Sequence, residues 1–380
     1  MVCMRNRVLL ITRNLPPLRG GMERLNLHLV SSLVGEYEVA IVGPTGCAAH
    51  LPAARRDCSE VPHRPLLRFM LGALWASFRL AWRARPLIVL AGSGLTAPIA
   101  WLVARLAGAR CIVYVHGLDL VATHPVYRVF WLPFIRHADM VLANSVNTAQ
   151  LAMRCGVTSS RVSVLHPGTK VPGHDSALSS EFRAIHGFGD RPILLSVGRL
   201  TPRKGLVEFV LDVFPEVLKA QPDALLVVIG ADAHDALSSV PGSQCQRIRD
   251  AAVRAGIDHA LHMLPPCSDA TLAMAYCSAD VHVFPIRSVP GDVEGFGMVA
   301  IEAAAHGLPT VAFAVGGVAD AVVEGRSGSL VAEGDYLRFA DKVVEWISRR
   351  EDRRVASACI EAARLFSWER FGKQLRANLV

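Results

Sequence analysis

Two glutamates around a glycine-containing turn are the residues of this chain best suited to chemistry. Glu294 opens the sequence EGFGM, and Glu302 follows eight residues later in an alanine-rich run that Gly307 and Pro309 end. The pattern predicts a helix beginning at Met298, with unpaired backbone N–H groups that suit a phosphate or a sugar hydroxyl. Because two carboxylates repel a diphosphate, they would instead accept hydrogen bonds from a sugar ring and a ribose. The alternative is an ordinary N-terminal helix carboxylate and a solvated glutamate.

A pair of basic residues lies earlier in the same half of the chain. Arg199 and Lys204 belong to the segment SVGRLTPRKG, residues 196–205, which follows a predicted strand. Two cations in such a loop can neutralise a diphosphate leaving group without a metal ion. A solvated loop that carries two charges is the other interpretation.

The N-terminal half contributes two weaker candidates. Gly20 and Gly21 stand directly before a predicted helix, where they would let the backbone approach a phosphate closely. His116 ends the predicted strand CIVYVHG, and ligands gather at the carboxyl ends of strands in an α/β fold. Both also have ordinary explanations, since glycines often precede helices and histidines occur in protein cores.

Several common motifs are absent from the sequence. It contains no D-x-D, no H-E-x-x-H and no paired Cys/His spacing, so we expect neither a metal-held diphosphate nor a zinc site, and no cofactor. It also lacks G-x-G-x-x-G after the first strand and G-x-S-x-G. These absences argue against a dinucleotide oxidoreductase and an α/β-hydrolase.

The elements that would position these residues alternate between apolar strands and amphipathic helices. This rhythm predicts an α/β fold with two Rossmann-like, doubly wound domains that face a central cleft. A segment rich in Pro, Gly and Ser interrupts the rhythm after His166. The expected division is therefore an N-terminal domain at 1–172, a linker at 173–190, a C-terminal domain at 191–358, and a closing helix at 359–380.

Charge and cysteine content constrain the environment of the chain. The 380 residues carry a net charge of +7, but residues 1–180 hold 19 Lys and Arg against 8 Asp and Glu, while residues 181–380 hold 21 against 25. Nine cysteines without a C-x-x-C pair, and an initial apolar run too short for a signal peptide, predict a cytoplasmic protein. No nucleic-acid recognition module accompanies the positive charge, so nucleic acid is not an expected partner.

The basic N-terminal half also raises the question of membrane contact. Residues 64–85, RPLLRFMLGALWASFRLAWRAR, interleave arginines with leucines and tryptophans, which suits a helix lying in an anionic membrane interface. A core helix with one solvated face is the alternative. The uncharged segment from Pro86 to Ala104 is long enough to span a bilayer, but Gly92 and Gly94 divide it into a predicted strand and a helix.

Taken together, these segments resemble glycosyltransferase family 4 of the GT-B fold over most of the chain. The resemblance rests on the EGFGM turn with its two glutamates, on GRL-x-x-RKG, and on the closing FSWERF. It implies that the N-terminal domain binds the acceptor, that the C-terminal domain binds the nucleotide-sugar, and that the closing helix returns toward the first domain. It implies that Glu294 lies by the donor sugar, that Glu302 holds the ribose, that Arg199 and Lys204 bind the diphosphate, and that His116 contacts the sugar. The expected donor-binding set is Gly20, Gly21, Arg199, Lys204, Leu264, Glu294, Gly295, Phe296, Gly297, Met298 and Glu302.

The resemblance also implies a reaction. The expected enzyme is a retaining, metal-independent hexosyltransferase that moves mannose or a related hexose from a GDP- or UDP-sugar to a lipid-linked, polysaccharide or lipopolysaccharide acceptor. The segment RSVPGDVEGFGMV is particularly similar to mannosyltransferases that act on phosphatidylinositol mannosides. Pro265, Pro266 and Asp320 depart from the family pattern and leave the nucleotide base open. A sugar-nucleotide epimerase and a non-catalytic nucleotide-sugar-binding subunit remain alternatives, as does Glu294 acting as a nucleophile.

Overall fold

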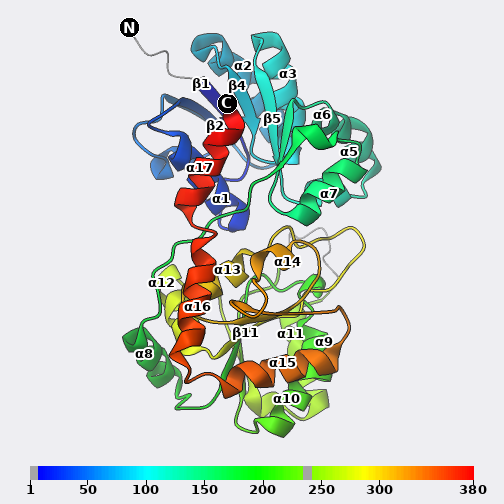
Figure 1. Ribbon diagram of the computed structural model, residues 1–380. Helices are drawn as coiled ribbons and strands as arrows, with labels where there is room; N and C mark the ends of the chain where they lie inside the picture. The colour runs from blue at the N-terminus through cyan, green and yellow to red at the C-terminus, as the bar shows by residue number, and fades with distance from the viewer. Residues whose placement is uncertain (1–6, 234–241) are drawn as a thin grey trace. The chain divides into compact units, whose positions relative to one another are not determined.

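The computed structural model describes residues 7–233 and 242–380 and divides into two compact units (Figure 1). Unit 1 comprises Met1–Gly168 and Trp368–Val380, and unit 2 comprises Thr169–Ser367. Each unit is a Rossmann-like α/β domain built on one parallel sheet, as the alternation of strands and helices predicted. The predicted α/β class is therefore confirmed for both halves.

Unit 1 contains a seven-stranded sheet in the order β3-β2-β1-β4-β5-β6-β7. Its strands are β1 Arg7–Ile11, β2 Glu38–Pro44, β3 Asp57–Val61, β4 Ile88–Ala91, β5 Arg110–Val115, β6 Met140–Ala143 and β7 Val162–Val164. Its helices are α1 Gly21–Leu33, α2 Leu66–Ala84, α3 Ala97–Ala107, α4 Leu118–Val121, α5 Pro125–Phe130, α6 Leu132–Arg136, α7 Val146–Arg154 and α17 Trp368–Leu379. The central strands are buried on both faces, which explains why they read as unbroken apolar runs.

Two apolar layers hold this sheet. One face of the sheet packs Leu9 and Ile11 against α2 and α3, while the other packs Val8 and Leu10 against α1 and α17. Side chains of one strand thus alternate between the two layers with the period of a strand. The C-terminal helix α17 is an integral part of unit 1, and Arg376 ties it to α1 through a 2.9 Å hydrogen bond from Nη1 to the Ser32 carbonyl oxygen.

Unit 2 contains a six-stranded parallel sheet in the order β10-β9-β8-β11-β12-β13. Its strands are β8 Ile193–Val197, β9 Leu225–Ile229, β10 Leu261–Leu264, β11 Val281–Phe284, β12 Thr310–Phe313 and β13 Gly328–Val331. Its helices are α8 Ser176–His186, α9 Leu206–Glu208, α10 Phe214–Ala220, α11 Gln244–Ala255, α12 Asp269–Ser278, α13 Met298–Ala305, α14 Val318–Ala321, α15 Tyr336–Ser348 and α16 Arg353–Arg364. Helices α10, α11 and α15 cover one face of the sheet, and α8 and α12 pack on the other.

The strand order of unit 2 reverses direction at β8. This strand pairs with β9 on one side and with β11 on the other, so the chain winds outward both ways from the pair β8–β11. Ligands of open α/β sheets bind at the carboxyl ends of strands beside such a reversal. The loops that follow β8 and β11 are therefore the expected ligand-binding loops, and they contain six of the twelve predicted site residues.

Two predicted boundaries differ from the structure. The predicted linker at 173–190 contains helix α8, because Asp175 caps its first turn through a 2.9 Å hydrogen bond from the Ala177 N–H and Phe182 is buried in the core of unit 2. The returning segment begins at Trp368 and not at residue 359, since α16 belongs to unit 2. The Pro, Gly and Ser content of the segment hid α8 from sequence analysis, and in the structure α8 packs on α12.

Helix α2 combines features of both interpretations of residues 64–85. Phe69, Ala73 and Leu80 are buried against the sheet, as a core helix requires. The opposite side exposes a line of large apolar side chains, with Leu67 70%, Leu71 60%, Trp75 65% and Trp82 87% accessible. Within residues 7–233 and 242–380, no helix has the length and apolar character needed to cross a membrane.

Candidate active site

The loops after β8 and β11 in unit 2 contact each other through backbone. Gly205, at φ +65°, lies so close to the loop after β11 that a Cβ on it would be 2.0 Å from the carbonyl oxygen of Pro285. The Arg287 N–H donates a 2.9 Å hydrogen bond to the Arg203 carbonyl oxygen. This contact brings the basic segment of residues 196–205 against the acidic segment around Glu294.

An ion-pair network joins the two loops. Lys204 Nζ lies 3.1 Å from Glu294 Oε2, and Arg203 pairs with the same carboxylate oxygen. Arg203 also places its Nε 3.1 Å from Asp292 Oδ1. All four side chains are largely buried, with between 11% and 16% of their surface accessible. Lys204 further lies over the ring of Phe284, with Nζ 4.5 Å from the ring centroid.

Burial and charge act against each other on Glu294. Burial alone would raise the pKa of its carboxyl, but the charges of Lys204 and Arg203 outweigh it and lower the pKa to about 2. Burial lowers the pKa of Lys204, and its contact with Glu294 offsets this only in part because Arg203 and Arg199 oppose it. The carboxylate is therefore charged at neutral pH, and its attraction keeps a desolvated ammonium group in place.

The glycine turn after Glu294 is held by close backbone packing. Gly317 donates its N–H to the Glu294 carbonyl oxygen at 2.9 Å, and a Cβ on Gly317 would meet the Gly295 carbonyl oxygen at 2.0 Å. Gly297 is the N-cap of α13 at φ +93°, and it has no side chain with which to cap the following amides. Phe296 is buried and packs on Phe366, so only its backbone is suited to meet a ligand.

Glu302 lies on the second turn of α13, as predicted, and has polar support that was not predicted. The Tyr276 hydroxyl donates a hydrogen bond of 3.3 Å to Glu302 Oε2. The ring of Tyr276 stacks on His306 at 5.2 Å, and His306 Nδ1 lies 2.8 Å from the Glu302 carbonyl oxygen. The Glu302 carboxylate is thus oriented from α12 as well as from its own helix.

Two other predicted residues of unit 2 lie on the same edge of the sheet. Arg199 lies two residues after the end of β8 and is exposed, but its charge contributes to lowering the pKa of the Lys204 amine. Leu264 ends β10, where its carbonyl oxygen accepts a 3.1 Å hydrogen bond from the Gly230 N–H. Strand β9 separates β10 from β8, so Leu264 lies one strand away from the basic segment and outside the ion-pair network.

His116 belongs to unit 1, where it is buried after β5. Its Nε2 lies 2.9 Å from the Gly92 carbonyl oxygen, which makes Nε2 the protonated nitrogen. Its backbone N–H donates to Asp119 Oδ2 at 3.0 Å. The ring is therefore oriented by β4, with Nδ1 as the nitrogen left to meet a ligand.

Gly20 and Gly21 stand at the start of α1, as predicted, and a carboxylate already lies beside them. A Cβ on Gly20 would be 2.3 Å from Glu23 Oε2, and Glu23 Oε1 accepts a 2.7 Å hydrogen bond from Asn14 Nδ2. A phosphate bound at this helix start would lie next to that negative charge. At this helix start the backbone can approach a phosphate closely, but the Glu23 carboxylate would repel the phosphate.

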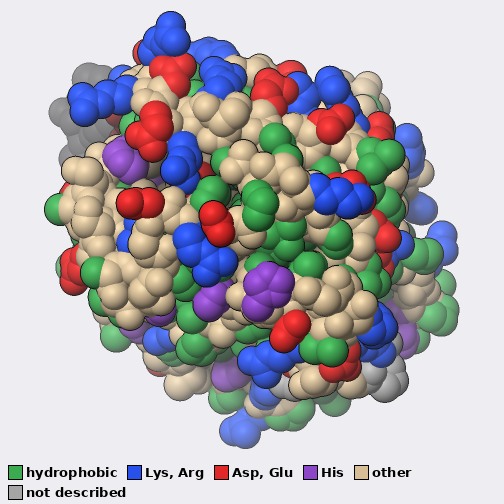
Figure 2. All heavy atoms as spheres, turned by 90° about the horizontal axis from the view of Figure 1, so that it is seen from below, with side chains coloured by type: hydrophobic (Ala, Val, Ile, Leu, Met, Phe, Trp, Pro, Cys, Tyr) green, Lys and Arg blue, Asp and Glu red, His purple; other side chains and the backbone are tan. Residues whose placement is uncertain are grey.

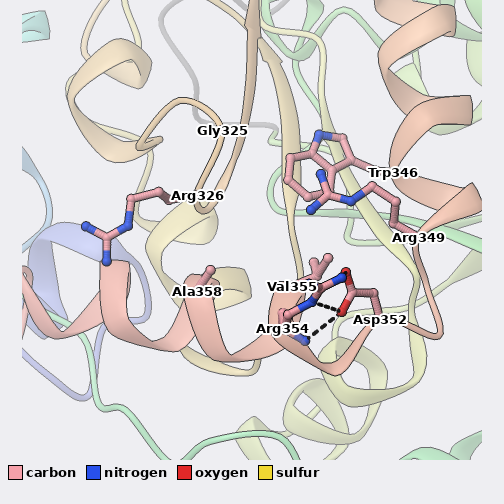
Figure 3. A pocket seen from close by; sticks show the side chains of 8 residues that line it. All are labelled: Gly325, Arg326, Trp346, Arg349, Asp352, Arg354, Val355 and Ala358. Atoms are coloured by element: carbon pink, nitrogen blue, oxygen red, sulfur yellow. Dashed lines mark hydrogen bonds and ion pairs between the residues drawn. The ribbon is translucent and has the colours of Figure 1, made fainter.

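A separate pocket of about 340 Å³ lies at the opposite edge of unit 2, where β13 begins (Figure 3). Arg354 pairs with Asp352 at 2.9 Å, and the guanidinium of Arg349 lies 4.6 Å from the ring centroid of Trp346. The lining residues are Gly325, Arg326, Trp346, Arg349, Asp352, Arg354, Val355 and Ala358. None of the predicted donor contacts is among them.

The distribution of surface charge and the grouping of possible metal ligands bear on the partners of the protein. Lys and Arg side chains alternate with Asp and Glu on the face shown in Figure 2, and its described part carries no large block of one sign. In residues 7–233 and 242–380 there is no group of three or more His, Cys, Asp or Glu side chains arranged to hold a metal ion.

Sequence reasoning missed three residues of this region. Arg203 is adjacent to Lys204, and Asp292 lies two residues before Glu294. The signal in the sequence was their opposite charge beside residues that had been identified as site residues. Tyr276 carried no signal, because an aromatic residue in an apolar helix reads as core. The structure places Lys204 and Glu294, two of the predicted site residues, in direct contact.

Comparisons with known proteins agree with this arrangement. A model described as Glycosyl transferases group 1 matches residues 179–365, and one described as Glycosyltransferase Family 4 matches residues 19–171. A GDP-mannose-dependent alpha-(1-6)-phosphatidylinositol monomannoside mannosyltransferase from Mycobacterium tuberculosis is 30% identical over 92% of this chain and 91% of its own length. The protein of the same description from Mycolicibacterium smegmatis is 28% identical, again over 92% and 91%.

Solved structures show the same fold at lower identity. The structure of Anabaena HepE in complex with UDP matches with a TM-score of 0.77 and 16% identity, over 98% of this chain and 99% of that one. The two Rossmann-like units, the basic and acidic loops at the strand reversal, and the two family models all lead to one assignment. The chain belongs to the family 4 glycosyltransferases of the GT-B fold, and its reaction transfers a sugar from a nucleotide-sugar.

Proposed function

We propose that this enzyme is a retaining, metal-independent hexosyltransferase that transfers mannose or a related hexose from a GDP- or UDP-sugar. The contact between Lys204 and Glu294 is the observation that carries the proposal. It places a buried cation next to a buried carboxylate at the carboxyl edge of the sheet, beside the strand reversal where such folds bind ligands. A diphosphate can replace the carboxylate as the partner of Lys204, which leaves Glu294 to accept hydrogen bonds from sugar hydroxyls.

The proposed reaction breaks the bond between the anomeric carbon and the diphosphate oxygen and forms a bond to the acceptor oxygen on the same face. Lys204, Arg199 and the amides of Gly295–Met298 stabilise the negative charge that develops on the leaving diphosphate. A phosphate oxygen takes the acceptor proton, so no protein base is needed. Glu302, oriented by Tyr276, binds the ribose hydroxyls of the donor.

The electrostatics of Glu294 support this route over one that uses it as a base. A carboxylate with a pKa of about 2 is a weak proton acceptor at neutral pH, since a general base works best with a pKa near the operating pH. Its negative charge can instead stabilise positive charge on the sugar ring. His116, protonated on Nε2, would contact the donor sugar through Nδ1.

A lipid-linked acceptor at an anionic membrane surface fits the N-terminal half best, with a polysaccharide or lipopolysaccharide acceptor as the second candidate. The names of the mycobacterial relatives describe enzymes that act on a phosphatidylinositol mannoside. On α2, the exposed Leu67, Leu71, Trp75 and Trp82 stand among arginines, and the Arg79 guanidinium lies 5.1 Å from the Trp75 ring centroid. Large apolar side chains beside arginines suit the membrane interface.

Two experiments test the reaction. A panel of UDP- and GDP-sugars should contain one donor that stabilises the protein, by about 2.7 kcal/mol at 100 times its dissociation constant. That donor should then be transferred in the presence of excess EDTA. Donor interconversion without an acceptor would indicate an epimerase, binding without hydrolysis or transfer would indicate a non-catalytic subunit, and loss in EDTA that Mg²⁺ or Mn²⁺ restores would refute metal independence.

Vesicle binding tests the membrane surface. Vesicles that contain anionic lipid should retain the protein at low salt, with about 1 kcal/mol for each arginine near the surface. The triple substitution of Arg68, Arg79 and Arg83 to Gln should release it, and so should 1 M salt, where the Debye length is about 3 Å. A matched variant that removes three exposed arginines of unit 2 (Arg249, Arg254 and Arg353 to Gln) should stay bound. Wild-type protein that ignores the vesicles would favour a soluble acceptor.

A further inference from the structure

Arg203 is the centre of the ion-pair network, although the proposed reaction assigns it no task. Its side chain is 12% accessible, its Nε lies 3.1 Å from Asp292 Oδ1, and its Nη1 pairs with Glu294. Its backbone is fixed as well, since its carbonyl oxygen accepts the Arg287 N–H at 2.9 Å. One guanidinium thus bridges two carboxylates on the loop after β11 from a clamped position on the loop after β8.

The bridge depends on the shape of the guanidinium group. Arginine carries its N–H groups on a rigid planar fork, so Nη1 can donate to Glu294 while Nε lies at ion-pair distance from Asp292, without hydrogen-bond geometry. A lysine ammonium is instead a single compact charge. Asp292 and Glu294 are two residues apart and point to the same fork. Asp292 therefore holds Arg203 by charge attraction, and Arg203 in turn orients Glu294 through the hydrogen bond from Nη1.

Glu294 has two cationic partners in the network. Lys204 and Arg203 both contact Glu294 Oε2. If Lys204 turns to the diphosphate of a bound donor, as the proposed function requires, Glu294 would lose one of its two cationic partners. A buried carboxylate without a partner is strongly disfavoured, so a second cation is required at that moment.

We propose that Arg203 is a positioning residue, held by Asp292, that fixes the Glu294 carboxylate in place and in its charged form when Lys204 turns to the donor diphosphate. This inference rests on the proposed function of the same site. It assigns Arg203 no contact with the donor. The two cations of the sequence RKG thereby have separate tasks, Lys204 toward the leaving group and Arg203 toward the protein's own carboxylate.

Kinetics of four variants test the assignment. Arg203→Gln should lower kcat by about a hundredfold, as small misplacements of a reacting group do, with the KM for donor within about threefold of wild type. Arg203→Lys should recover part of kcat, since it keeps the charge and loses the fork. Asp292→Asn should lower kcat less, and Arg203→Gln added to Glu294→Gln should have almost no further effect, because both act through one carboxylate.

The pH profile gives a readout that a purely structural ion pair would not move. Glu294 faces Lys204 and Arg203; Asp292 pairs with Arg203, and the charge of Arg199 acts on Lys204. Burial, and after it the charge of Lys204, lowers the pKa of His282 to about 3, so His282 is neutral above that pH. Removing Arg203 raises the pKa of Glu294. The acid limb of the kcat profile should therefore move to higher pH by about one to three pH units in Arg203→Gln.

Each outcome decides the question. An unchanged kcat and acid limb in folded Arg203→Gln overturns the proposal, and a raised KM with unchanged kcat makes Arg203 a donor contact instead. If Arg203→Gln does not fold, Arg203→Lys and Asp292→Asn carry the kcat test, and an unchanged kcat in both would refute the proposal. Wild-type protein that binds no nucleotide-sugar in the thermal screen would instead reject the proposed function itself.

Discussion

Replacing Glu294 by Gln should destabilise unit 2 as well as remove activity. The substitution keeps the shape of the side chain but removes the charge that Lys204 and Arg203 share. The pKa of Glu294 is lowered from 4.5 to about 2, and at about 1.36 kcal/mol per pKa unit this corresponds to about 3 kcal/mol of folding free energy at pH 7. The side chain is 16% accessible, so solvent screens this interaction only weakly.

The sign of the pH dependence follows from the direction of the shift. The pKa in the folded state lies below that of the unfolded state, so the contribution is present above about pH 4.5 and is lost as the pH falls toward about 2. The free energies of unfolding of wild type and Glu294→Gln, from urea denaturation followed by circular dichroism, should differ by about 3 kcal/mol at pH 7. The difference should shrink to about half of that at pH 3.

A matched substitution isolates the effect of burial. Glu361 forms a 3.2 Å ion pair with Arg326, but the two side chains are 62% and 49% accessible. Glu361→Gln should therefore change the free energy of unfolding by less than about 1 kcal/mol at any pH. Equal effects of the two substitutions, or a Glu294→Gln effect that does not vary with pH, would refute the reasoning.

Ligand binding by the same variant provides a second check. Glu294→Gln should lose at least about a hundredfold in sugar transfer, as the loss of one transition-state contact does. It should nevertheless bind a nucleoside diphosphate at least as tightly as wild type, because the Glu294 carboxylate no longer competes with the diphosphate for Lys204. Calorimetry that shows weakened nucleoside diphosphate binding would contradict the exchange of partners proposed for Lys204.

Three further predictions follow from single contacts. Lys204→Ala should reduce transfer by at least about a hundredfold while circular dichroism reports a folded protein, and near-normal rates would remove its assigned role. Gly205→Ala should lower the melting temperature far more than Gly256→Ala, because both glycines have φ near +65° but only Gly205 abuts a backbone oxygen at 2.0 Å; equal shifts would refute the close approach. Tyr276→Phe, which removes the hydrogen bond to Glu302, should raise the dissociation constant for the nucleoside diphosphate about fivefold, and an unchanged constant would show that Glu302 needs no such support.

The parts of the fold with strong local signals were predictable. Buried strands such as β8 and β11 are apolar runs, and the glycine turn before Met298 begins a helix as expected. Helix α8 was missed because the Pro, Gly and Ser content before Asp175 outweighed the capping signal of Asp175 itself, and because packing of Phe182 in the folded core is invisible locally. The start of the returning segment was also missed, since α16 and α17 are both amphipathic.

The candidate site was predictable only in part, for a related reason. Glu294 and Lys204 stood out because their types and neighbours matched a site for an anionic, hydroxyl-rich ligand. Their mutual contact, the bridge made by Arg203 and the support of Glu302 by Tyr276 join segments about 26 to 91 residues apart along the chain. Such pairings depend on how β8, β11 and α12 are ordered in the folded unit, which residue spacing does not encode.

The placement of α17 in unit 1 sets an order for biosynthesis. All of unit 2, Thr169–Ser367, emerges from the ribosome between the two parts of unit 1. At about 5–20 residues per second, the wait for α17 lasts about ten to forty seconds. During that time Leu25 and Leu29 of α1, which share an apolar layer with Phe371 and Leu375, lack their C-terminal partner. A nascent chain that stops before Trp368 therefore carries a complete unit 2 and a first unit in which the apolar side of α1 lacks the cover of α17.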